Sequence, residues 1–201
     1  MIPRPQSPAG ALIELVVIVA VALGLALVIQ AFLVKPYRIP SESMVPTLTI
    51  GQRVIVNRVG THLGDPDIGD VVVFNPPAGA DSNECGADHD FNQACPKPTD
   101  KKSRQTFIKR VVAGPGDRLK IVQGHPIVNG KRIPDSFSRA CGGGDSCNLD
   151  KEFRIPAGHF FMMGDNRGAS DDSRFWGPVP DDNIIGRAFL TYWPPKRVGT
   201  L

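Results

Sequence analysis

The feature that most constrains the fold of this chain is an apolar run over residues 11–34. The run contains one charged residue, Glu14, near its start and one strongly polar residue, Gln30, near its end. A helix of this length would reach roughly 36 Å, enough to cross the hydrocarbon core of a bilayer with some tilt. The alternative is a cleaved secretory signal, but its apolar core spans only about 7–15 residues. We therefore predict a transmembrane helix over 11–34, preceded by a short segment over 1–10.

The rest of the chain has the composition of strands and turns. Among 201 residues there are 21 Gly and 19 Pro, more than a helical bundle tolerates. Segments rich in Val and Ile alternate with turn signals, and Asn129-Gly130 marks a hairpin. The predicted strands cover residues 53–59, 70–74, 106–113, 118–122, 127–133, 160–163 and 184–193. We predict a mainly β fold in which the N-terminal transmembrane helix precedes an antiparallel β-sheet domain over 35–201.

Two polar segments interrupt the strand pattern, near residues 78–105 and 135–150, and we predict that both are surface loops. Each segment holds two of the four cysteines, which are Cys85, Cys95, Cys141 and Cys147. Their spacings lack the C-x-x-C pairs of a zinc site and favour two local disulfides in an oxidising, extracytoplasmic compartment. Four free thiols in a cytosolic domain are the alternative.

Composition gives little support to a nucleic acid partner or a metal. The formal net charge is only +3, and no basic cluster has interleaved aromatic residues, so we predict no nucleic acid partner. Asp88, His89 and Asp90 could ligate a metal ion, but only with a defined ligand geometry. We predict no metal and no organic cofactor.

The stretch PSESMVPTL, residues 40–48, follows the apolar run after five intervening residues. Its ordinary interpretation is a helix N-cap or a serine-rich connector. However, Pro46 disfavours a helical backbone at Val45, so the segment is predicted to be extended or turned. The chain between Val34 and Ser43 can reach at most about 30 Å, which keeps Ser43 close to the membrane surface. A nucleophilic serine at this place would meet substrates that lie in the membrane.

A nucleophilic serine needs a general base. The chain has four histidines, His62, His89, His125 and His159. None of them has the sequence context of a Ser/His/Asp triad. The other candidate base is a lysine, because period-two alternation places Lys109 on one strand face with Phe107 and Val111.

A lysine with an ordinary pKa near 10.4 is neutral in only about one molecule in 2,500 at pH 7. A catalytic amine therefore needs its pKa lowered to near neutrality, and desolvation on an apolar strand face has this effect. The alternative for Lys109 is a strand lysine whose amine reaches water.

The third segment, MGDNRGASDDSRFWG at residues 163–177, is rich in paired charges. It combines three aspartates, two arginines and two serines, namely Asp165, Asp171, Asp172, Arg167, Arg174, Ser170 and Ser173. This composition suits ion pairs and turn hydrogen bonds that hold a loop rigid, and either serine could orient a base. The alternative is a solvated acidic loop.

Taken together and in this order, these segments resemble the type I signal peptidases, membrane-anchored Ser-Lys proteases that remove signal peptides from exported proteins. The resemblance covers residues 36 to about 193. It rests on PSESMVPTL at 40–48, GDVVVF at 69–74, FIKRVVAGPGD at 107–117 and GDNRGASDDSRFWG at 164–177. It implies an antiparallel β-sheet catalytic domain of the signal-peptidase type.

The resemblance also implies a role for several residues. Ser43 would be the nucleophile and Lys109 the general base, with Ser170 hydrogen-bonded to the lysine amine. The backbone N–H of Ser43 and the hydroxyl of Ser41 would form the oxyanion hole. Supporting ion pairs would join Asp172 to Arg174 and Asp165 to Arg110. The pocket for small substrate side chains, typical of Ala-x-Ala cleavage sites, would be lined by Ile39, Met44 and Ile108.

Charge counting does not orient the predicted span, because Arg4 precedes it and Lys35 and Arg38 follow it. The resemblance implies a single-pass protein of the bacterial plasma membrane, with the segment 1–10 in the cytoplasm and the catalytic domain outside. The implied partners are preprotein signal peptides and membrane lipid, with the secretion translocon as a further candidate. The segment 78–105 has no counterpart that we can assign in the family. The competing hypotheses are an anchored binding module on an inactive scaffold and a Ser-Lys self-cleaving repressor, which would need a DNA-binding domain.

Overall fold

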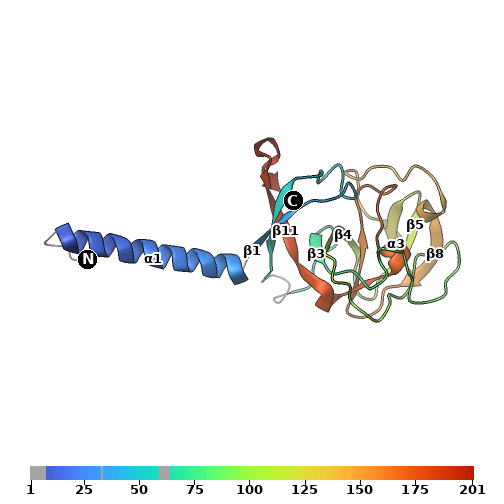
Figure 1. Cartoon of the computed structure of the whole chain (residues 1–201). Helices are drawn as coiled ribbons and strands as arrows, with labels where there is room; N and C mark the ends of the chain where they lie inside the picture. The colour runs from blue at the N-terminus through green and yellow to red at the C-terminus, as the bar shows by residue number, and fades with distance from the viewer. Residues whose placement is uncertain (1–7, 33, 59–63) are drawn as a thin grey trace.

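The computed structural model describes residues 8–32, 34–58 and 64–201, and it begins with one long helix, α1 (Pro8–Phe32). This helix is long and apolar enough to cross a membrane, and it projects away from the rest of the protein (Figure 1). The helix α1 begins at Pro8 and ends at Phe32, whereas the transmembrane span is predicted over 11–34. Val34 already belongs to a strand, whose backbone hydrogen bonds are made to a neighbouring strand. Residues 1–7, which make up most of the predicted segment 1–10, lie outside the described residues.

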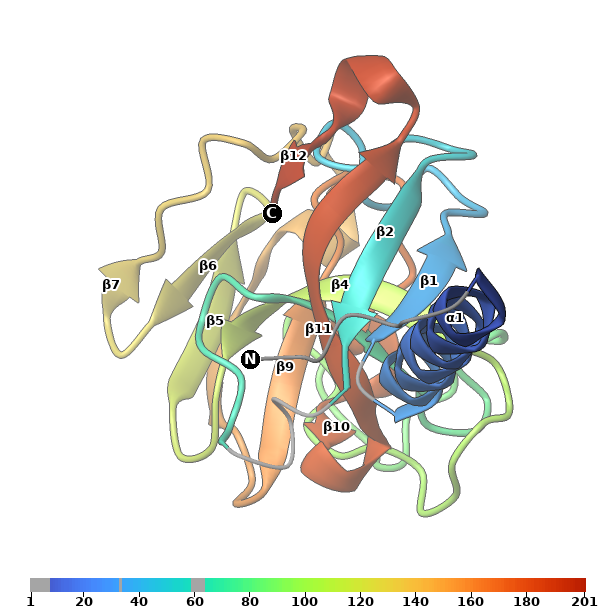
Figure 2. The same cartoon turned by 90° about the vertical axis from the view of Figure 1, so that its left-hand side faces the viewer.

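The main sheet is antiparallel and has the strand order β1-β2-β11-β3-β4-β9-β10, with β12 paired to β11. Its strands are β1 (Val34–Arg38), β2 (Arg53–Asn57), β3 (Val71–Phe74), β4 (Phe107–Ala113), β9 (His159–Met163), β10 (Val179–Pro180), β11 (Ile184–Trp193) and β12 (Gly199–Thr200). The late strand β11 lies between the early strands β2 and β3, and Figure 2 shows it beside β2. The first and last parts of the domain are therefore held together by backbone hydrogen bonds.

A smaller antiparallel sheet has the order β7-β6-β5-β8. Its strands are β5 (Arg118–Val122), β6 (His125–Val128), β7 (Lys131–Arg132) and β8 (Leu149–Arg154). The predicted hairpin is present, and both Asn129 and Gly130 have positive φ angles, 51° and 78°, as a type I′ turn requires. Strand β8 was missed, because three consecutive charged residues at its centre are exposed and hide the alternation.

Short helical turns occupy the connections between strands. They are η1 (Asp145–Cys147), α3 (Ser173–Trp176), η2 (Asp181–Asn183) and η3 (Pro195–Arg197). The fold class predicted from the sequence, mainly β after an apolar helix, is confirmed. Three predicted strands were too long: β2 ends at Asn57, β3 begins at Val71, and β4 begins at Phe107. Residues 59–63 lie outside the described residues.

Buried apolar residues form clusters that join these elements. One cluster packs the small sheet, through Leu119 and Phe153, against Val112 and Phe161 of the main sheet. A second cluster lies beneath residues 39–48 and is described with the site. Burial of each large apolar side chain contributes about 1.5–3 kcal/mol. The two sheets and the loops between them therefore form one packed β domain.

The segments predicted as loops contain the two disulfides of the structure. Cys85 is bonded to Cys95, and Cys141 is bonded to Cys147. The first segment, residues 78–105, lacks named helices and strands, whereas the end of the second segment enters β8. Both pairings are the local ones that the sequence spacing favours.

Candidate active site

The serine segment is a tight loop between β1 and β2. Its ends are joined by two hydrogen bonds, from Ile39 N to Gln52 O at 2.9 Å and from Gly51 N to Ile39 O at 2.8 Å. Inside the loop, Ile39, Met44 and Leu48 are almost completely buried in the second apolar cluster. The apolar positions of PSESMVPTL thus anchor the loop. As a result, the backbone around Ser43 has a defined position.

Ser43 is 7% exposed, and its backbone carbonyl oxygen accepts a hydrogen bond from the backbone N–H of Asn166 at 3.0 Å. Its hydroxyl oxygen lies 3.3 Å from that of Ser41. Ser41 is exposed and lies on the same pocket wall. The structure therefore brings together the two serines to which the resemblance gives the nucleophile and oxyanion-hole roles.

Lys109 lies in the middle of β4, where it is only 4% exposed. Burial lowers the pKa of its amine to about 8, although Asp172, Asp171 and Asp165 act in the opposite direction through their negative charges. Desolvation is the larger effect because the ammonium form loses its hydration in the protein interior. The amine lies 5.8 Å from the centre of the Phe107 ring. The apolar strand face expected from the sequence alternation is thus present around this lysine.

A pocket of about 730 Å³ contains both candidate groups. Its wall consists of residues from β1, the serine segment, β3, β4 and the loop after Gly168, namely Tyr37, Arg38, Ile39, Pro40, Ser41, Glu42, Ser43, Val73, Gln105, Thr106, Phe107, Ile108, Lys109, Ala169 and Asp171. Ile39 and Ile108 line it, as the resemblance implies. Met44 does not: it is fully buried in the cluster beneath the wall, because it anchors the loop. The prediction of Met44 as a lining residue is therefore not met in this structure.

The implied hydrogen bond between Ser170 and Lys109 is also not made in this structure. The Ser170 hydroxyl is buried and has no hydrogen-bond partner among the described residues. It lies beside Gly164, close to the Ser43 carbonyl oxygen. Likewise, none of the hydrogen bonds in the described part of the chain joins Lys109 to Ser43. The lysine amine instead lies 5.8 Å from the centre of the Phe107 ring.

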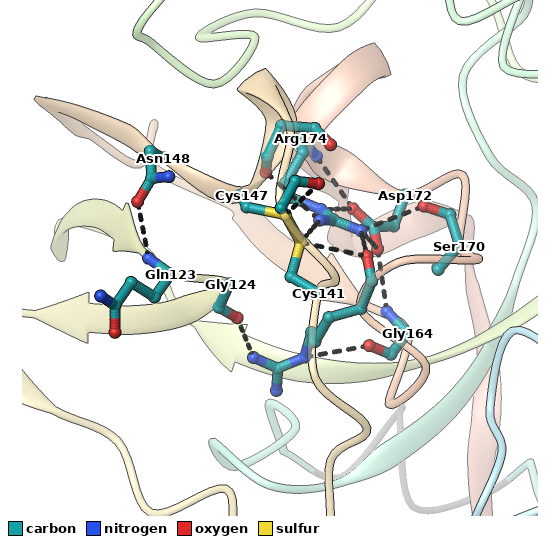
Figure 3. Close-up of a disulfide and its surroundings, with 12 residues drawn as sticks. Gln123, Gly124, Cys141, Cys147, Asn148, Gly164, Ser170, Asp172 and Arg174 are labelled. Carbon is teal, nitrogen blue, oxygen red and sulfur yellow. Dashed lines mark hydrogen bonds and ion pairs between the residues drawn. A yellow bond between two sulfur atoms is a disulfide. The ribbon is translucent and has the colours of Figure 1, made fainter.

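Asp172 and Arg174 form a buried ion pair at the start of α3 (Figure 3). Arg174 Nε donates to Asp172 Oδ1 at 2.8 Å, and Nη2 donates to Oδ2 at 3.0 Å. The same carboxylate accepts from the backbone N–H of Gly164 at 3.0 Å. Burial alone would raise the pKa of Asp172, but the Arg174 guanidinium overrides this effect and holds the pKa below its ordinary value. The pair predicted from the resemblance is present and supports the loop that begins at Gly164.

Ser173, which the sequence offered as a second group for orienting a base, has a structural role instead. Its hydroxyl accepts a hydrogen bond from the backbone N–H of Met162 at 3.0 Å. This contact attaches α3 to β9 and leaves Ser173 fully buried. It is absent from the pocket wall.

Sequence reasoning missed a second buried network, centred on Asp135. Arg167 Nη1 donates to Asp135 Oδ2 at 2.9 Å, and Arg167 Nε donates to the Gly164 carbonyl at 3.1 Å. His125 Nδ1 lies 2.8 Å from the same carboxylate oxygen. Burial would raise the pKa of Asp135, but the hydrogen bond from His125 and the charge of Arg167 lower it. No signal in the sequence marked Asp135, which lies in a segment predicted to be a surface loop.

The histidines described by the structure lie outside the pocket wall. His89 and His159 face the carbonyl oxygens of Ala87 and Ala157, at 3.3 Å and 2.8 Å, and His125 contacts Asp135. His62 lies outside the described residues. Across residues 8–32, 34–58 and 64–201 no cluster of three or more His, Cys, Asp or Glu side chains suits a metal ion. Among the described residues of the pocket wall, Lys109 is thus the candidate base for Ser43.

Known proteins resemble this chain over most of its length. The model of a family described as signal peptidase, peptidase S26, matches residues 12–193. Signal peptidase I of Leptolyngbya laminosa is 34% identical over 202 residues, covering 99% of this chain and 87% of that protein. A probable thylakoidal processing peptidase 2 of Arabidopsis thaliana is 34% identical over 183 residues, covering 90% of this chain and 44% of that protein. A solved signal peptidase I from Enterococcus faecalis V583 has a TM-score of 0.41 at 20% identity, covering 62% of this chain and 97% of that one.

The family match extends over most of the chain, and the relative from Leptolyngbya laminosa covers almost all of it. A match of this length includes the serine segment, the lysine strand and the loop that begins at Gly164. The chain therefore belongs to the signal peptidase family, peptidase S26.

Proposed function

We propose that this chain is a serine endopeptidase that cleaves N-terminal signal peptides from exported preproteins, with Ser43 as nucleophile and Lys109 as general base. The observation that carries the proposal is that both groups line one pocket, where burial lowers the pKa of the lysine to about 8. At this pKa roughly one amine in ten is neutral at pH 7, some two orders of magnitude more than for an ordinary lysine.

In the proposed reaction, Ser43 Oγ attacks the carbonyl carbon of the scissile peptide bond while its proton passes to Lys109 Nζ. The backbone N–H of Ser43 and the Ser41 hydroxyl, 3.3 Å from Ser43 Oγ, stabilise the oxyanion that forms. The lysine then returns the proton to the leaving amine, and the signal peptide remains as an ester on Ser43. A water molecule, deprotonated by Lys109, hydrolyses this ester, and the proton finally returns to Ser43.

The proposed reaction requires the lysine amine to move within hydrogen-bond reach of Ser43 Oγ. Catalytic hydrogen bonds often tighten only when substrate is bound. The long lysine side chain can make this move by changing rotamers inside the pocket. A substrate chain in the pocket would also displace water and favour the neutral amine. The buried Ser170 hydroxyl would then have a partner if it receives a hydrogen bond from the lysine amine.

We further propose that the apolar wall, including Ile39, Val73 and Ile108, selects small side chains at the first and third positions before the cut. A shallow apolar pocket excludes larger side chains by steric overlap, so Ala-x-Ala sites are the expected substrates. The proposed mechanism uses side chains, backbone and water, and it needs no metal or organic cofactor.

The proposed location is the outer face of a bacterial plasma membrane, with α1 as a single span and the N-terminus in the cytoplasm. The two disulfides support an oxidising side for the catalytic domain. Membrane lipid would surround α1, and the secretion translocon is the candidate protein partner that delivers preproteins. Protease protection of the N-terminus and of the β domain in sealed vesicles would test this orientation.

The decisive test is cleavage of a preprotein with an Ala-x-Ala site by the purified full chain in detergent. Ser43→Ala and Lys109→Ala should each abolish cleavage, and Lys109→Arg should fail too because a guanidinium stays protonated. Lys120→Arg, in β5 and away from the pocket wall, is the matched control and should retain activity. Circular dichroism would show whether each variant is folded. Full cleavage by Ser43→Ala would contradict the dyad, whereas absence of cleavage by the folded wild type would favour the alternative of an anchored binding module.

A further inference from the structure

Asp171 brings a carboxylate to the wall of the pocket that holds Ser43 and Lys109, and the proposed mechanism gives it no role. Its neighbour Asp172 is fully buried in the pair with Arg174, whereas Asp171 is exposed. The backbone of Asp172 is extended, with φ −154° and ψ −168°, so that consecutive side chains here project to different sides. The Asp172 carboxylate therefore lies in the interior of the loop, whereas the Asp171 carboxylate lies on the pocket wall.

The segment 78–105 holds Asp171 in this position. Asn83 Nδ2 donates a hydrogen bond to Asp171 Oδ1 at 3.1 Å. Asn83 has a positive φ of 56°, a conformation that asparagine tolerates better than most residues, and it lies two residues before Cys85. The side chain that binds Asp171 is thus part of a tight turn next to the first disulfide.

Cys95, at the other end of this disulfide, also contacts the segment that contains Asp171. The backbone N–H of Cys95 donates to the carbonyl of Arg174 at 3.0 Å. Gly177, just after α3, lies so close to the backbone of Lys97 and Pro98 that a side chain there would overlap it. Residues 83–98, which include the disulfide, therefore contact the active-site loop at Asp171 and again at Arg174 and Gly177.

Charged groups on the pocket wall are few. They are Arg38, Glu42, Lys109 and Asp171, and the remaining residues of the wall are uncharged. The charge of Asp171 reaches into this space, since it is one of the groups that raise the pKa of Lys109 against the effect of burial. A substrate side chain near the cut would feel the same charge.

We propose that Asp171, positioned by Asn83, is a specificity-determining residue that favours a cationic substrate side chain beside the scissile bond and disfavours an anionic one. The inference rests on the proposed peptidase function. Two unit charges about 4 Å apart in water change a binding or rate constant by roughly fivefold. A Lys and a Glu substrate differ by two charges, so their ratio should change by more than this when Asp171 is neutralised.

The experiment measures kcat/KM for preproteins that differ only in one residue, Lys, Gln or Glu, placed second before the cut or first after it. Asp171→Asn should lower the Lys-to-Glu ratio by at least about fivefold at low salt, and 1 M salt should largely remove this difference. Asn83→Ala should lower the ratio by a smaller factor, and Asp171→Glu should preserve it. Asp81→Asn is the matched control, because Asp81 is an exposed carboxylate of the same segment that is absent from the pocket wall.

The outcomes separate the two hypotheses. If the wild type cleaves all substrates but Asp171→Asn leaves the ratio unchanged, the inference is wrong and the peptidase function stands. If the wild type cleaves none of them, the proposed function itself fails. A changed ratio in Asp171→Asn with an unchanged ratio in Asn83→Ala would remove the positioning role of segment 78–105. An equal change in the Asp81→Asn control would show a general charge effect and overturn the assignment to Asp171.

Discussion

Asp165 accepts two hydrogen bonds from the guanidinium of Arg110, 2.9 Å and 2.7 Å long. A third hydrogen bond comes from the hydroxyl of Thr47 at 2.5 Å. Arg110 follows the candidate base in β4, Thr47 belongs to the serine segment, and Asp165 belongs to the loop after β9. One buried carboxylate therefore connects three of the segments that form the pocket, which are far apart in the sequence.

Asp165→Asn should destabilise the domain and reduce activity. The substitution leaves the mostly buried Arg110 guanidinium without its counterion, and breaking a buried pair from one side costs on the order of 3 kcal/mol. Chemical unfolding of the two proteins would measure this loss. Glu152→Gln is the matched control: its pair with Arg118 is solvent-exposed and should contribute less than about 1 kcal/mol. Equal stability of Asp165→Asn and the wild type would contradict the bracing role.

Cleavage should speed up as the pH rises through about 8. Lys109 acts as a base only when neutral, and its pKa in the free protein is lowered to about 8. The acidic limb of kcat/KM against pH reports the free enzyme and should therefore have its midpoint near that value. A rate that is constant or falls between pH 7 and 9 would exclude Lys109 as the titrating base.

Lys109→Met should be inactive and more stable than the wild type at pH 7. The unfolded chain binds the lysine proton more tightly than the folded chain, so the wild type gains stability as the pH rises from about 8 toward 10.5. Methionine removes this penalty, a gain on the order of 3 kcal/mol at pH 7. Thermal unfolding should show that the variant is more stable than the wild type at pH 7 and that this difference is largely lost at pH 10. Lys120→Met, in β5, is the control and should lack this pH-dependent gain.

Gly164→Ala should reduce activity without preventing folding. A methyl group at this position would overlap the Ser170 side chain and the Ser43 carbonyl oxygen, and must push one of them aside. A displacement of about 1 Å at a reacting group can cost on the order of 100-fold in rate. Gly199→Ala, which has no neighbouring atoms within 4 Å of the added methyl, should retain full activity. Similar rates for both variants would show that Ser43 tolerates the displacement.

The two disulfides should each stabilise the protein. Non-reduced peptide mapping by mass spectrometry should link Cys85 with Cys95 and Cys141 with Cys147. The bridges close short loops, so replacing either pair with serine should cost roughly 2–3 kcal/mol in the loop-entropy model. Unfolding in denaturant would measure the cost. Free thiols in the mature protein would contradict both pairings.

Features that depend on neighbouring residues were accessible from the sequence. The apolar run predicted a helix, and alternation placed Lys109 among apolar side chains because strand periodicity is local. The hairpin at Asn129-Gly130 followed from turn chemistry alone. The motif resemblance supplied Ser43, which its own sequence surroundings could not have separated from an ordinary connector.

Features that depend on distant residues became visible only in the folded chain. Asp135 and Arg167 are 32 residues apart, and neither residue type nor spacing indicated their buried contact. Met44 looked like a pocket residue, yet packing turned it into an anchor beneath the wall. The contact between Asn83 and Asp171 joins residues 88 positions apart. Local backbone preferences and side-chain alternation act over a few residues, so the helix, most strands and the candidate residues could be predicted without the structure. Strand pairing and side-chain packing join residues that are far apart in the sequence. Only the folded chain therefore shows which side chains share the pocket.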